Sequence, residues 1–170
     1  AYVARAEADG YTLLFGTAAA HIVTPMIQPT PYDGIKDFTF IALAANQPNL
    51  LVVNPSVKAN SAKELVELAR SNPGKLNYGS SGTGTSPHLG GELIKQQAKI
   101  EMAHIPYGGA APAITDTIGG QVDGFIGDIS GLMSNIKANK VKALAIAAPK
   151  RSPLLPEVPT FDELGVPNVY

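Results

Sequence analysis

The sequence predicts an α/β fold built around a parallel sheet. Between residues 76 and 148, four apolar runs of strand length alternate with three segments of helical periodicity. The last run, residues 141–148, is apolar on both faces apart from Lys142, which is typical of a parallel strand that is covered on both sides. Alternation of strand and helix also implies right-handed crossovers. We therefore expect this region to form one α/β lobe.

Three further strands and two helices are predicted before this region. Residues 11–15 (YTLLF) lie between two glycines and have the composition of a strand. Residues 17–27 can continue from it as a helix. The apolar runs at residues 38–45 and 49–53 also have strand length.

A capping box marks the start of the next helix. In residues 61–64 (SAKE), the Ser61 hydroxyl and the Glu64 carboxylate have the spacing at which each satisfies the other's free backbone amide. The helix should run to Arg70, because residues 72–74 (NPG) stop it.

The alternating region then resolves into seven elements. We expect strands at residues 76–80, 100–105, 122–127 and 141–148, and helices at residues 87–98, 111–118 and 129–138. The glycine pair at 119–120 ends the second of these helices.

Composition excludes several classes of protein. The chain has 170 residues, 45% of them hydrophobic and only 16% charged, so it can bury a core and is not a disordered tail. Its formal net charge is −1, without a block of like charges, which argues against a nucleic-acid partner. The absence of cysteine excludes disulfides, thiol catalysis and zinc–thiolate sites.

No membrane-spanning segment is predicted, because no apolar run reaches about 18 residues. The first ten residues (AYVARAEADG) resemble the end of a helix followed by a turn, without an initiator Met or a leader pattern. We therefore expect the chain to be a piece of a longer protein, with any signal peptide outside it.

The loops that follow the strands form the candidate site. In open α/β sheets, ligands bind outside the carboxyl ends of the strands. These loops are residues 80–86 (SSGTGTS), 106–109 (PYGG) and 128–131 (DISG), and none contains Lys or Arg. Each leads into a helix N-terminus, whose free amides and positive partial charge favour an anion.

The first loop is the main candidate for ligand contact. Its five hydroxyls belong to Ser80, Ser81, Thr83, Thr85 and Ser86. Its glycines, Gly82 and Gly84, let the backbone approach a ligand closely. Alternatively, Ser86 caps the helix and the glycines only form the turn. Capping needs one hydroxyl rather than five, so we expect a binding role.

The other two loops supply further walls of the expected site. Tyr107 and Gly108 should form the second wall and Asp128 the third. Asp128 could equally serve only as the cap of the helix that follows it.

Catalytic and metal-binding motifs are absent. Gly79 and Gly84 have the spacing of a phosphate-binding loop, but Thr85 stands where the lysine must be, which leaves a nucleotide-binding role weak. No pair of histidines has the spacing of metal ligands, so no metal and no cofactor are expected. A hydrolase that uses Ser81 or Ser86 with His88 is the alternative, although residues two apart do not face each other on a helix.

A series of short motifs follows one order along the whole chain. They are DGYTLL (9–14), LNYGSSG (76–82), TSPHL (85–89), HIPY (104–107), GGQVD (119–123), KRSP (150–153) and PEVPT (156–160). With these motifs the chain resembles the substrate-binding proteins of tripartite tricarboxylate transporters, the Bug or TctC family.

The resemblance implies a two-lobed fold of the type II periplasmic-binding-protein kind. Residues 1–46 would form part of the first lobe, residues 47–149 a complete second lobe with a mostly parallel sheet, and residues 150–170 the return to the first lobe. The strands that connect the lobes would lie near residues 43–51 and 147–149.

The resemblance also implies a function. An exported, periplasmic, monomeric and non-enzymatic protein would close over a small di- or tricarboxylate and deliver it to membrane permease subunits. Gly16, Thr17 and His21 would face the cleft from the first lobe, unless Thr17 is only a cap and His21 a surface residue. The same fold could instead pass its ligand signal to a receptor as a sensory module.

Overall fold

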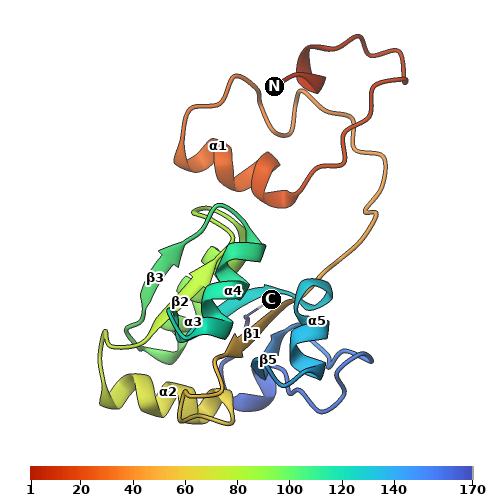
Figure 1. The fold of residues 1–170 in the computed structure, drawn as a ribbon. Helices are drawn as coiled ribbons and strands as arrows, with labels where there is room; N and C mark the ends of the chain where they lie inside the picture. Colours follow the sequence, from red (N-terminus) through yellow and green to blue (C-terminus); the bar gives the residue numbers. More distant parts are fainter. Residues whose placement is uncertain (170) are drawn as a thin grey trace. The chain divides into compact units, whose positions relative to one another are not determined.

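The structure, a computed structural model, describes residues 1–169 (Figure 1). The chain divides into two compact units, residues 1–46 and the residues from Gln47 onwards. The larger unit contains the sheet and the candidate loops, and the smaller unit is described separately below.

The larger unit is built on a five-stranded sheet with the order β3-β2-β4-β1-β5. The strands are β1 (Asn49–Val53), β2 (Asn77–Ser80), β3 (Ala103–Pro106), β4 (Gly124–Asp128) and β5 (Lys142–Ala147). β2 pairs in parallel with β3 and β4, whereas β1 pairs antiparallel with both β4 and β5. The predicted α/β class with a mostly parallel sheet is confirmed. Strand β1 lies at the predicted residues, but its antiparallel direction and its place between β4 and β5 were not predicted.

Helices cover both faces of this sheet (Figure 1). They are α2 (Ala62–Ser71), α3 (Ser86–Ala98), α4 (Ala110–Gly119) and α5 (Ile129–Lys137). Successive strand residues point to opposite faces, so Leu51 packs with α2 and α3 while its neighbour Leu50 packs with α4 and α5. All of these strands and helices lie within a few residues of their predicted positions.

The start of α2 differs from the predicted capping box in one detail. The backbone amide of Glu64 donates to Ser61 Oγ over 3.2 Å, as expected. The Glu64 carboxylate, however, accepts from the amide of Asn60 over 2.8 Å, one residue before the cap. The reciprocal bond is therefore displaced by one residue.

The segment after β5 packs onto the larger unit. Thr160 forms a parallel bridge with Ile146, and a 3₁₀ turn follows at Asp162–Leu164. Phe161 and Val169 join the core shared with α2 and α3, where they are 2% and 1% exposed. These apolar side chains are buried against the sheet of the larger unit, and the assignment of residues 150–170 to a first lobe stays a prediction.

The smaller unit contains little regular structure. A 3₁₀ turn occupies Val3–Arg5, and a π-helical stretch, Ala19–Val23, continues into α1 (Thr24–Ile27), which confirms the helix predicted there. The strands predicted at residues 11–15 and 38–45 are wrong. Both runs are irregular, and side chains such as Phe15 are exposed (83%). A strand requires a hydrogen-bonded neighbour, and neither run finds one among residues 1–169.

Candidate functional site

The candidate site lies at one edge of the sheet in the larger unit. The carboxyl ends of the parallel strands β2, β3 and β4 meet there, and each strand runs into the N-terminus of a helix: α3, α4 and α5 respectively. Because β1 is antiparallel, its first residue lies at the same edge, where Asn49 pairs opposite Asp128. This edge therefore collects three helix N-termini in one place.

Residues 80–86, which we call the hydroxyl loop, form a tight turn between β2 and α3. Gly82 and Gly84 have φ values of +133° and +80°, which residues other than glycine rarely adopt. Thr85 Oγ1 donates to the carbonyl of Gly82 over 2.6 Å and so closes the turn. The glycines are thus required by the backbone path.

The hydroxyls of this loop fall into two groups. Ser80 is fully buried, and its Oγ lies in a 2.7 Å hydrogen bond with His104 Nε2. The hydroxyls of Ser80 and Thr85 are therefore engaged inside the fold. Within residues 1–169, those of Ser81, Thr83 and Ser86 have no intramolecular hydrogen bond. The sequence could not distinguish the groups, because all five residues have the same chemistry.

The second wall lies directly beside the hydroxyl loop. The amide of Tyr107 donates to the carbonyl of Ser80 over 3.1 Å, and the Tyr107 ring covers Gly79. The Tyr107 hydroxyl donates to Asp116 on α4 over 2.8 Å, and burial together with this acidic partner raises the pKa of Tyr107. Tyr107 thus offers its ring and backbone, while Gly108 beside it is exposed.

Asp128 stands at the carboxyl end of β4. It occupies the cap position of α5, yet its side chain makes no capping hydrogen bond. Burial raises the pKa of the Asp128 carboxyl. Opposite it, Asn49 Oδ1 is buried and finds no hydrogen-bond partner among residues 1–169. The part of the candidate site around Asp128 and Asn49 is consequently rich in hydrogen-bond acceptors.

Gly16, Thr17 and His21 belong to the smaller unit. Thr17 Oγ1 accepts from the amide of Ala20 over 3.3 Å, so Thr17 caps the helical segment. His21 is buried rather than on the surface, with Nδ1 2.8 Å from the carbonyl oxygen of Gly34. Their role in ligand binding stays a prediction.

A cluster of side chains beneath the hydroxyl loop was missed in the sequence. The rings of His88 and His104 are stacked with centroids 4.1 Å apart, and Tyr78 lies against His104. The Tyr78 hydroxyl and Lys95 both donate to Glu92, over 2.9 and 2.8 Å. Burial and the neighbouring His88 lower the pKa of His104. The only signal for this cluster was the position of two residues in their strands. Tyr78 and His104 each lie two residues before the end of a strand, and the two strands are parallel neighbours.

The geometry does not favour the hydrolase alternative. His88 Nδ1 accepts from the amide of Gly84 over 3.1 Å and is not directed to a serine hydroxyl. The serine–histidine pair that does form, Ser80 with His104, has its hydroxyl fully buried, where no substrate reaches it. Among residues 1–169, no group of three or more His, Asp or Glu side chains is arranged to hold a metal ion.

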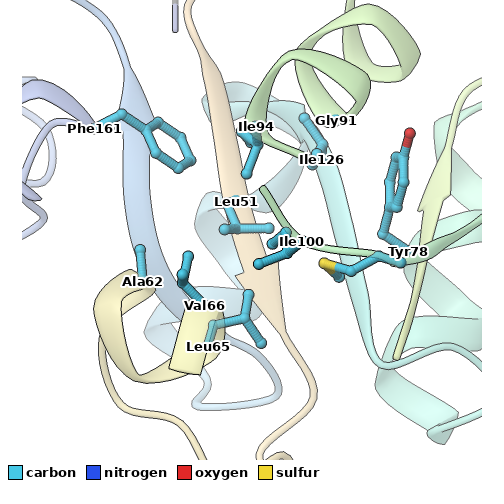
Figure 2. A pocket seen from close by; sticks show the side chains of 11 residues that line it. Leu51, Ala62, Leu65, Val66, Tyr78, Gly91, Ile94, Ile100, Ile126 and Phe161 are labelled. Atoms are coloured by element: carbon cyan, nitrogen blue, oxygen red, sulfur yellow. The ribbon is translucent and has the colours of Figure 1, made fainter. Parts of the chain in front are cut away.

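The larger unit also has an interior cavity of about 20 Å³ between the sheet and helices α2 and α3 (Figure 2). Leu51, Leu65, Ile94, Ile126 and other apolar side chains line it. Such a space accepts a water molecule only where polar partners are present. It is therefore a packing defect of the core and not the ligand site.

In the described part of the chain, no helix combines the length and apolar character needed to cross a membrane.

A family model and several curated proteins match the chain. The family described as "Tripartite tricarboxylate transporter family receptor" matches residues 1–170. A "UPF0065 protein in tcbD-tcbE intergenic region" from Pseudomonas sp. (strain P51) is 39% identical, over 98% of this chain and 50% of that protein. Protein BugT from Bordetella pertussis is 32% identical, over 97% of this chain and 51% of its own length. The chain thus spans about half the length of the curated relatives it matches.

Solved structures also resemble most of the chain. "Structure of a periplasmic transporter" has a TM-score of 0.91 and 41% identity, covering 99% of this chain and 57% of the other. "R. palustris Rpa4515 with adipate" has a TM-score of 0.91 and 37% identity, covering 98% and 56%. MatC from Rhodopseudomonas palustris with bound malate has a TM-score of 0.76 and 30% identity, covering 88% and 49%.

Proposed function

The chain belongs to the tripartite tricarboxylate transporter receptor family, and from this we propose that it forms one wall of a binding site for a small di- or tricarboxylate. The family consists of receptors and not of enzymes. The observation that carries the proposal is the meeting of three helix N-termini at one sheet edge, beside a loop with free hydroxyls.

The chemistry of this edge suits a carboxylate. Helix N-termini offer unpaired amides and positive partial charge, and the hydroxyls of Ser81, Thr83 and Ser86 add donors. Hydrogen bonds to a charged group contribute about 1.5–3 kcal/mol each. Four or five of them are enough for micromolar affinity, which corresponds to about −8 kcal/mol. Lys and Arg are not needed, and the three loops contain none.

Two structural relatives support the class of ligand. One is described with adipate and the other with bound malate, and both are small dicarboxylates. We propose that the protein acts in the periplasm as a monomer and hands such an acid to permease subunits. Co-purification from membranes that contain the permease would test the partner, and light scattering would test the monomer.

Binding itself is tested by isothermal titration with malate, adipate and citrate, and with succinamide as an uncharged control. We expect at least one acid to bind and succinamide not to bind. Ser81→Asp places a negative charge in the hydroxyl loop and should weaken binding at least about tenfold, since like charges at close range cost more than 1 kcal/mol. Gln97→Glu adds the same charge on the exposed end of α3 and should bind like the wild type.

Either of two results would contradict the proposal. The first is a folded protein that binds none of the three acids. The second is equal affinity for Ser81→Asp and Gln97→Glu, which would place the ligand away from the hydroxyl loop.

A further inference from the structure

The N-termini of α2 and α3 share an arrangement with one difference. In α2 the cap residue is Ser61, and the carboxylate of Glu64, three residues on, accepts the amide of Asn60 over 2.8 Å. In α3 the cap residue is Thr85, and the imidazole of His88, three residues on, accepts the amide of Gly84 over 3.1 Å. A histidine therefore takes the position that glutamate or glutamine holds in an ordinary capping box.

This histidine bond holds one end of the hydroxyl loop. Thr85 makes no capping bond of its own, because its hydroxyl donates to Gly82 instead. Gly84 is buried and has a positive φ, so both its surroundings and its backbone conformation restrict this part of the loop. His88 consequently supplies the side-chain acceptor that fixes the loop where it joins the helix.

The surroundings of His88 favour an uncharged neighbour. Its ring is stacked on His104, whose Nε2 shares a hydrogen bond with Ser80 at the other end of the loop. Burial and the nearby His88 lower the pKa of His104, which favours the neutral form of that ring. The other groups around the pair are Tyr78, Glu92 and Lys95, and the Glu92 carboxylate is occupied by hydrogen bonds from both of the others.

We propose that His88 is a positioning residue, whose neutral imidazole fixes the hydroxyl loop without placing a negative charge beside the bound anion. The proposal rests on the proposed function, since it concerns the loop that receives the carboxylate. A glutamate would hold Gly84 equally well but would repel the ligand. The imidazole accepts the Gly84 amide only while Nδ1 carries no proton, because a protonated Nδ1 is itself a donor and faces the N–H of Gly84.

Three variants separate the parts of this proposal. His88→Gln keeps a neutral acceptor that does not titrate. His88→Glu keeps an acceptor but adds a negative charge. His88→Phe keeps a flat ring against His104 but removes the acceptor. Gln97→Ala, on the exposed end of the same helix, is the control for substitution in α3.

The first readout needs no ligand. In ¹⁵N-labelled protein at pH 8, long-range spectra should show the His88 proton on Nε2, and the Gly84 amide should be protected from exchange. At the same pH, His88→Gln and His88→Glu should keep this protection, because both retain an acceptor for the Gly84 amide. His88→Phe should lack it. A His88 proton on Nδ1, or Gly84 protection in His88→Phe equal to that of the wild type, would overturn the proposal.

The second readout is affinity for malate at pH 8. His88→Gln should bind like the wild type, His88→Phe about three- to tenfold more weakly, and His88→Glu at least about tenfold more weakly. Wild-type affinity in His88→Glu would show that the charge of this side chain does not matter and would overturn the proposal. If the wild type binds none of malate, adipate and citrate, the proposed function fails, while the exchange data still decide the role of His88.

Discussion

Two adjacent serines at the end of β2 illustrate how burial decides the role of a side chain. Ser80 is fully buried and bonded to His104, while Ser81 is half-buried and has no intramolecular bond among the described residues. Ser80→Ala leaves a nitrogen of His104 without its partner, so we expect it to lower the free energy of unfolding by about 1–3 kcal/mol. Ser81→Ala should change it by less than about 0.5 kcal/mol.

Urea denaturation of both variants, followed by circular dichroism, measures this difference. Titration with a carboxylate should show the opposite order: Ser81→Ala should weaken binding more than Ser80→Ala does, because Ser81 offers a free donor and Ser80 does not. Equal stability of the two variants would mean that the Ser80–His104 bond contributes nothing to the fold.

At the residue scale, the sequence points to candidate loops but does not show which of their atoms are free to bind. The hydroxyl loop is identified by composition alone, since five hydroxyls exceed what a turn needs. His88 and His104 are 16 residues apart, and no local spacing pairs them with each other. They meet only because β2 and β3 pair in register and α3 turns back over them. Such tertiary contacts cannot be read from local spacing.

At the element scale, α3 packs against β2 through a glycine. Gly91 lies against the ring of Tyr78, and an added Cβ would collide with that ring. At Gly90, one residue earlier, the nearest atoms to such a Cβ would be 3.8 Å away, which is ordinary contact. We expect Gly91→Ala to destabilise the protein by about 1–3 kcal/mol through overpacking. Gly90→Ala should stabilise it by up to about 1 kcal/mol through helix propensity.

Thermal or urea unfolding of the two glycine variants provides the measurement, and each is the control for the other. If Gly91→Ala is as stable as the wild type, α3 must be able to move away from the sheet. If both variants are destabilised equally, the helix backbone and not the Tyr78 contact is responsible.

The elements themselves follow from local pattern where a sheet is present to receive them. Residues 49–53 were predicted as a strand and form β1, because Leu50 to Val53 are buried from both sides. Residues 11–15 have an equally good strand composition but remain irregular. The difference lies in available partners, which the composition of a single segment does not reveal. Strand direction is hidden for the same reason, so β1 gave no sign of being antiparallel.

At the scale of the whole molecule, burial is distributed unevenly between the two units. Only His21 and Gly34 are buried among residues 1–46, whereas two apolar cores fill the larger unit. Local stability follows the number of buried apolar contacts. We therefore expect amides of residues 1–46 to exchange with deuterium much faster than those of β1, β4 and β5.

Hydrogen exchange followed by mass spectrometry tests this difference on the intact chain, with unfolded chain in denaturant as the reference for free exchange. Slow exchange across residues 38–45 would show that this run finds a hydrogen-bonded partner in solution. Exchange at a similar rate in both units would contradict the expected contrast.

The position of β1 has a consequence for how the protein is made. β1 is formed from residues 49–53, but both strands that flank it come much later, at Gly124–Asp128 and Lys142–Ala147. At a synthesis rate of about 5–20 residues per second, β1 leaves the ribosome several seconds before either neighbour exists. Its four consecutive apolar residues then have no partner. The nascent chain is thus most prone to aggregation in this interval, and a holding chaperone should recognise it there.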